Sequence, residues 1–137
     1  MLAPRDGAAI RVPFAVAFGP PRLNLLGAVE LSERAFPASD TRPAVLTIQA
    51  GAVRTVGSED EVQPVSRLDL ELFNTDGKRI GVVGRLRNLL PGRYAFGITG
   101  RDPGGQALEP APYRLRVVAY PVGGGRASVR NVRFSIE

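Results

Sequence analysis

Two carboxylates, Asp69 and Glu71, are the residues whose spacing comes nearest to that of an acid–base pair. They are two positions apart in a segment that alternates with leucine, and this spacing puts both side chains on one face of a strand. A glycosidase uses such a pair when burial raises the pKa of one of the two groups. Acids that alternate with leucine are also typical of a sheet with one solvated face. We interpret Asp69 and Glu71 as residues of such a face.

Most other enzyme chemistry is excluded by composition, because the chain has neither His nor Cys. It therefore has no imidazole base, no Ser-His-Asp triad, no thiolate nucleophile and no zinc site built from Cys or His. Its one lysine, Lys78, follows the turn residues Asp76-Gly77 and is expected to be solvated. We expect a protein that is not an enzyme and that carries no cofactor or tightly bound metal.

Two acidic stretches deserve comparison with calcium sites, because calcium takes six to eight oxygen ligands. Ser58-Glu59-Asp60-Glu61 is the densest acidic cluster and is expected in a loop between strands, and Asp102 opens the turn Asp102-Pro103-Gly104-Gly105. Neither has the spacing of an EF-hand. We interpret both as solvated turns, with weak calcium binding left open at each.

The net charge of +5 comes almost entirely from arginine, with residues spread from Arg5 to Arg133. Dispersed charge of this kind argues against nucleic acid as a partner, since a nucleic-acid footprint gathers on one face. Of the aromatic residues, only Phe36, Phe73 and Tyr120 fall off the inward-facing positions, which is few for a stacking platform.

Two arginine pairs at alternate positions, together with two arginines of the closing strand, could still form an anion-binding patch if those strands are neighbours. The residues of this predicted patch are Arg85, Arg87, Arg114, Arg116, Arg130 and Arg133. The alternative, which we favour, is that their long stems cover the outer surface of a sheet and keep its edges from pairing.

Short alternating segments separated by glycine and proline predict an all-β fold. The predicted strands are Ile10–Phe18, Leu25–Leu31, Ala44–Val53, Arg67–Phe73, Ile80–Arg87, Arg93–Thr99, Tyr113–Tyr120 and Val129–Ile136. Seven to eight such strands indicate a single antiparallel two-sheet sandwich. We expect one domain over residues 1–137, with residues 1–8 as a flexible end and Asn74-Thr75-Asp76-Gly77 as a hairpin turn.

The first predicted strand has the features of a strand-pairing segment. Its apolar residues alternate without a break, and Pro13 at an intervening position restricts it to a sheet edge or a bulge. The apolar residues of this segment are Ile10, Val12, Phe14, Val16 and Phe18.

The stretch from Leu108 to Ala119, with its Leu-Glu-Pro loop and a tyrosine that opens a strand, resembles fibronectin type III and related immunoglobulin-like domains. The resemblance implies that Tyr113, together with Leu108, forms a structural corner in which the hydroxyl returns to the backbone. Leu68 to Pro121 is also similar to immunoglobulin-like domains of flagellar hook-capping proteins and to accessory domains of secreted subtilisin-like proteases. The motifs that carry this are Asp76-Gly77, Pro91-Gly92-Arg93-Tyr94, Gly100 to Gly105 and Tyr113.

What the resemblance implies is a non-catalytic accessory module of an exported bacterial protein, located outside the cell or at its surface. Its partner would be another protein or a neighbouring domain of the same polypeptide. The chain has no apolar run long enough for a membrane span, and its first residues lack the pattern of a secretory signal, so a cytoplasmic location stays open. Two alternatives are a self-assembling fibre subunit that pairs through its first strand, and an anion-binding module.

Overall fold

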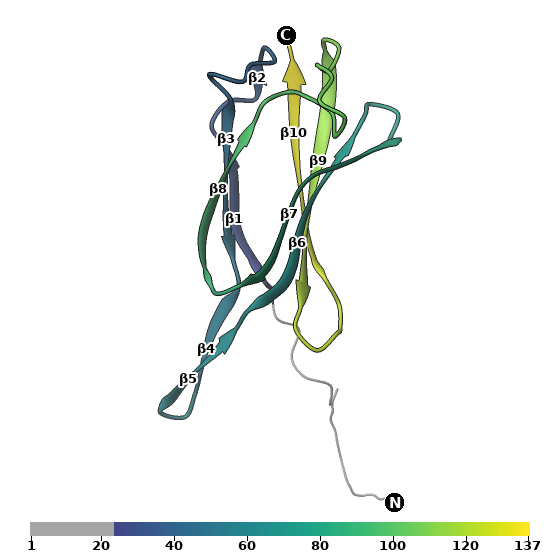
Figure 1. Ribbon diagram of the computed structural model, residues 1–137. Coiled ribbons are helices and arrows are strands. Elements are labelled where there is room, and N and C mark those ends of the chain that lie inside the picture. The colour runs from purple at the N-terminus through teal and green to yellow at the C-terminus, as the bar shows by residue number, and fades with distance from the viewer. Residues whose placement is uncertain (1–23) are drawn as a thin grey trace, which may run out of the picture.

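The computed structural model describes residues 24–137, and within that range the chain forms strands and no helix (Figure 1). The strands are β1 (Leu26–Leu31), β2 (Ala35–Phe36), β3 (Ala44–Ala50), β4 (Ala52–Val56), β5 (Glu59–Gln63), β6 (Val65–Phe73), β7 (Arg79–Leu89), β8 (Gly92–Ile98), β9 (Ala111–Pro121) and β10 (Ser128–Ile136). The predictions for residues 1–8 and for the strand Ile10–Phe18 lie outside the described residues.

These strands form two facing sheets and one separate hairpin. One sheet has the order β1-β3-β8, and the other has the order β2-β10-β9-β6-β7. All pairs are antiparallel except β2, which runs parallel to β10. The third unit, β4-β5, extends beyond the end of both sheets (Figure 1). The all-β prediction is confirmed.

A single hydrophobic core lies between the two sheets, and strand parity decides which residues enter it. Ile48 of β3, Leu70 of β6 and Leu115 of β9 are each at most 2% exposed, and all belong to the same cluster. Burial of a leucine or isoleucine side chain contributes about 1.5–3 kcal/mol. The alternation predicted for these strands is thus the alternation between core and solvent.

The segment predicted as one strand over Ala44–Val53 is in fact two strands. It is interrupted at Gly51, whose φ of +78° is incompatible with continuing the sheet. The chain then forms the β4–β5 hairpin. Ser58 lies in its turn, but the prediction of a loop is wrong for Glu59 to Glu61, because Glu59–Gln63 is a strand paired with Ala52–Val56. The sequence pattern did not predict this hairpin, because its residues lack the apolar alternation of a half-buried strand.

Strand β2 is only two residues long and has no periodicity of its own. It places Phe36 in the core, where the ring stacks on Phe134 at 5.5 Å between centroids. The interpretation of Phe36 as a residue off the inward-facing positions is therefore wrong. With β2, β4 and β5 the described residues contain ten strands, against the seven to eight predicted for the whole chain.

Tyr113 lies at the start of β9 with its ring in the core and 8% of its surface exposed. Its hydroxyl donates a hydrogen bond of 2.8 Å to the carbonyl oxygen of Glu109, four residues earlier, while Leu108 packs against the same core. Burial raises the pKa of the Tyr113 hydroxyl above its usual value near 10, so the group stays protonated and keeps donating. This bond ties the crossing loop to the strand that follows it.

No helix in the described part of the chain has the length and apolar character needed to cross a membrane.

Candidate functional site

Each of the two sheets has two edge strands among residues 24–137, and β7 and β8 are edge strands that follow one another in the chain. Strand β7 pairs only with β6, and β8 pairs only with β3. The two strands are joined by Leu90 and Pro91 alone and rise from that connection on the same side of the molecule (Figure 1). We call the region between β7 and β8 the open side.

The two edges of the open side differ in their readiness to accept another strand. The pairing of β7 with β6 is shifted twice, which leaves Val83 and Ile80 as extra residues in bulges. Bulges twist an edge and blunt it against strand addition. The pairing of β8 with β3 is regular over all seven residues. The outward-facing residues of β8 are Arg93, Ala95 and Gly97. The β8 edge thus has little of the protection that natural sheets give their edges.

Apolar side chains line the open side but are not fully buried. Four apolar residues of the two strands, Val83 and Leu86 of β7 and Tyr94 and Phe96 of β8, are half-buried and pack against the core. Strand alternation predicts that Tyr94 and Phe96 face inward, and both pack against the core. Because their strand is an edge, they keep part of their surface in solvent.

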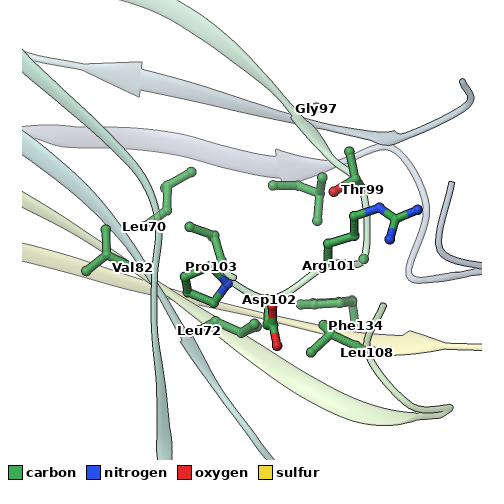
Figure 2. A pocket seen from close by; sticks show the side chains of 13 residues that line it. Leu70, Leu72, Val82, Gly97, Thr99, Arg101, Asp102, Pro103, Leu108 and Phe134 are labelled. Atoms are coloured by element: carbon green, nitrogen blue, oxygen red, sulfur yellow. The ribbon is translucent and has the colours of Figure 1, made fainter. Parts of the chain in front are cut away.

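A cavity of about 210 Å³ opens between β7 and the end of β8 (Figure 2). Figure 2 shows Leu70, Val82 and Pro103 at one end of it and Leu108 and Phe134 at the other. Its volume is below the range of roughly 300–1,000 Å³ that is usual for small-molecule sites. Its size suits one or two side chains of a docked polypeptide, and its lining mixes leucine and valine side chains with Thr99, Arg101 and Asp102.

The loop after β8 forms the rim of the cavity and is held by its own polar contacts. Arg101 donates from Nε and Nη2 to the two carboxylate oxygens of Asp40, at 2.8 and 3.1 Å, and this hydrogen bond lowers the pKa of Asp40. Asp102 Oδ1 accepts the backbone N–H of Gln106 at 2.9 Å, which closes a turn. Both charged residues of the rim are therefore engaged within the fold.

The outer surface of the five-stranded sheet carries a second candidate site, which we call the arginine face. Its members come from four neighbouring strands: Arg67, Arg79, Arg85, Arg87, Arg114, Arg116 and Arg133. With Asp69 and Glu71 on the same surface, the formal charge of this face is +5, whereas the other described residues together carry −2. The strands thus gather charge that is dispersed along the sequence.

Five of the six predicted patch residues lie on the arginine face, and Arg130 does not. Arg130 pairs in register with the inward-facing Val117 and donates from Nη2 to the carbonyl oxygen of Leu26 at 3.1 Å. It therefore links β10 to β1 and is unavailable to an outer ligand. Strand parity already separates Arg130 from Arg133, because they are three positions apart, whereas the contact with Leu26 depends on β1 lying beside the start of β10.

At the centre of the arginine face, Asp69 is only 2% exposed, so the expectation that it is solvated is wrong. Arg85 donates from Nε to Asp69 Oδ1 at 2.7 Å and from Nη2 to Oδ2 at 3.2 Å, and this contact raises the pKa of Arg85. Arg67 also pairs with Asp69 and lies over the ring of Tyr120, 4.3 Å from its centroid. A carboxylate held by two guanidinium groups is a structural anchor and has no free proton-accepting role.

The remaining acids do not assemble into a metal site. In the part of the chain that the structure describes, no three Asp, Glu, His or Cys side chains lie close enough together to hold a metal ion. Asp60 accepts a hydrogen bond from Thr55 Oγ1, and Glu61 pairs with Arg54, each across the β4–β5 ladder at 2.8 Å. These acids hold the hairpin together.

Neither the open side nor the buried aspartate was found from the sequence. The open side had one usable signal, since only residues 88–92 separate the predicted strands Ile80–Arg87 and Arg93–Thr99 and leave no room for a further strand between them. No family model matches this chain, and a search of the curated proteins finds no match.

Proposed function

We propose that this chain is a non-catalytic, immunoglobulin-like β-sandwich module that binds a protein partner through the open side. The observation that carries the proposal is the unpartnered, regular edge of β8 beside half-buried apolar side chains. An exposed sheet edge binds an extended segment by main-chain hydrogen bonds, and pockets for alternate side chains supply specificity.

The order of the strands supports the immunoglobulin-like assignment. With β1, β3 and β8 in the positions of strands A, B and E, the strands β6, β9 and β10 take those of C, F and G. The Tyr113 hydroxyl bonds to the backbone four residues upstream, as does the tyrosine corner of that fold. The same resemblance supports an extracellular or surface location in an exported bacterial protein.

The absence of enzymatic activity is part of the proposal and rests on composition. The whole chain lacks His and Cys, and the paired carboxylates Asp69 and Glu71 are engaged by arginines. Without an imidazole, a thiolate or a free carboxylate pair, the usual sources of proton transfer and nucleophilic attack are missing.

A photo-crosslinking amino acid at Ala95, on the exposed edge of β8, tests this function in the cells that make the protein. We expect a discrete protein adduct from position 95 and none from a matched probe at Asn131, which is exposed on the arginine face. Mass spectrometry identifies the partner. A probe at Ala95 that yields no more adduct than the one at Asn131 contradicts the proposal.

A second candidate function, anion binding, is favoured by the charge of the arginine face. Within residues 24–137, three of its members, Arg87, Arg114 and Arg133, have no carboxylate contact, and Arg114 lies over the ring of Phe73 at 4.6 Å. Because Phe73 and Tyr120 are covered by guanidinium groups, they offer no platform for stacking bases. The face therefore suits sulfate or carboxylate groups of an extended polymer.

Heparin chromatography distinguishes this function from simple net charge. We expect Arg87→Ala/Arg133→Ala to elute at clearly lower salt than the parent chain, because it removes from the face two of the three arginines that have no carboxylate contact among residues 24–137. The control Arg42→Ala/Arg93→Ala removes the same charge from exposed positions elsewhere. Equal elution of the two double variants would show that the arginine face is not a binding site.

A further inference from the structure

The edge of β8 has no neighbouring strand among residues 24–137, unlike the corresponding edge in one immunoglobulin arrangement. In the constant-type immunoglobulin arrangement a strand D pairs with strand E, the position of β8 here. The chain passes from β7 to β8 through Leu90 and Pro91, so no residues remain at that point to form such a strand. The half-buried state of Tyr94 and Phe96 is the direct consequence.

One segment of this chain has the pattern of a strand that could pair with the β8 edge. Residues 10–18 carry five apolar side chains at alternate positions, and they lie outside the described residues. Pro13 falls on the other parity, so every residue of the apolar parity keeps its backbone N–H. In a strand, alternate residues direct their N–H groups to opposite edges. This segment can therefore pair completely along one edge, as an added outer strand requires.

We propose that residues 10–18 of one copy of this chain dock on the open side of a second copy and extend its three-stranded sheet beside β8. The apolar side chains of the segment then cover Tyr94 and Phe96, while Arg11 and Pro13 face solvent. This inference rests on the proposed function and names its partner: a second copy of the same chain.

The open side fits such a strand in extent and in shape. Strand β8 offers a regular edge of seven residues to a segment of nine. The cavity of about 210 Å³ lies between β7 and the end of β8, where it can receive a terminal apolar side chain of the docked strand. Bulges make β7 the poorer edge, so β8 is the strand that is extended.

The direction in which the chain enters β1 favours a second copy over the same molecule. Leu25 donates its N–H to Ser128 Oγ at 2.9 Å, which fixes the start of β1 beside β10, and β3 separates β1 from β8. Gly19 and Pro20 both precede a proline, and residues in that position favour extended conformations. Docking on its own β8 would require the chain to reverse direction across the end of β3 within these few residues.

Each copy then offers one donor segment and one acceptor edge. Such a contact is heterologous, so it continues into an open chain of subunits unless the rotation closes it into a ring. Docking of residues 10–18 on β8 of a second copy would thus explain how the chain could act as a self-assembling fibre subunit.

Cysteine crosslinking of the full chain tests the contact cleanly, because the protein has no cysteine of its own. Ala15 and Ala95 are small residues, each at a position predicted or observed to face away from the core. We expect Ala15→Cys/Ala95→Cys, treated with a short bismaleimide that tolerates a shift of register, to give a ladder of dimers and larger species. The control Ala15→Cys/Asn131→Cys should give no ladder.

The source of the segment is read from the same gel. A crosslinked species with the mass of one chain, 14.6 kDa, and no ladder would mean that the segment folds on its own β8, which overturns the proposal. Equal ladders from the test and control variants would overturn it too. If the photo-probe at Ala95 finds a different protein while the ladder is absent, the proposed function stands and this inference fails.

Substitutions of opposite parity give an independent test by light scattering. We expect Val12→Asp/Phe14→Asp to lose self-association and to elute as a monomer, because it puts charge on the docked face. The control Ala15→Asp/Ala17→Asp places the same charges on the solvent face and should keep the assembly. A parent chain that is monomeric at high micromolar concentration, or two variants that behave alike, would contradict the docking. Unchanged circular dichroism shows that each variant is folded.

Discussion

Replacement of Tyr113 by alanine is expected to lower the free energy of unfolding by about 4 kcal/mol, since truncation of a core aromatic side chain leaves a cavity. The ring is buried and stacks on Phe134, with 5.8 Å between the ring centroids. Tyr113→Phe keeps the ring and removes only the bond to the Glu109 carbonyl, so it should cost about 1 kcal/mol. Denaturant titrations measure both values. Far-UV circular dichroism is the signal to follow, because the chain has no tryptophan whose fluorescence could report unfolding.

Tyr120 provides the matched control on the same strand. It lies on the outer surface beneath Arg67, and its side chain is half-buried. Tyr120→Ala should cost about 1 kcal/mol, the energy of a partly exposed cation–π contact. If Tyr113→Ala destabilises the protein no more than Tyr120→Ala does, Tyr113 is not the corner of the fold.

Gly51→Ala is expected to cost about 3 kcal/mol, through a strained backbone and an overpacked contact. Gly51 has a φ of +78°, and a Cβ built there would lie 2.7 Å from the Cα of Pro91. The backbone of Pro91 belongs to the two-residue connection between β7 and β8, so it has little freedom to withdraw. The midpoint of denaturant unfolding, at constant slope, measures the loss.

Gly57 separates the two causes. Its φ is +65°, but a Cβ there would meet nothing within 4 Å, because it lies at the tip of the β4–β5 hairpin. Gly57→Ala should therefore show the backbone strain alone, about 1 kcal/mol. Equal effects at the two glycines would mean that the close approach of Gly51 to Pro91 contributes nothing.

The candidate site was only partly predictable, and the arginines show why. Strand parity correctly placed Arg85, Arg87, Arg114 and Arg116 on an outer surface, because side chains alternate between the faces of a strand. Parity could not show that Asp69 is buried, since burial there comes from the guanidinium groups of Arg67 and of Arg85 on a neighbouring strand. Parity also separates Arg130 from Arg133, three positions further along the strand, so the prediction that placed both in one patch is wrong; the contact of Arg130 with Leu26 came only from the tertiary structure.

The amino-acid sequence by itself determined the class of the fold, most strand positions in the described range and the residues that enter the core. These depend on local alternation and turn chemistry, which are properties of neighbouring residues. Only the tertiary structure decided which strands are neighbours, that β7 and β8 remain edges, and that arginines distant in the sequence share one surface. Those features arise from pairing between distant segments, whose register and order no local pattern encodes.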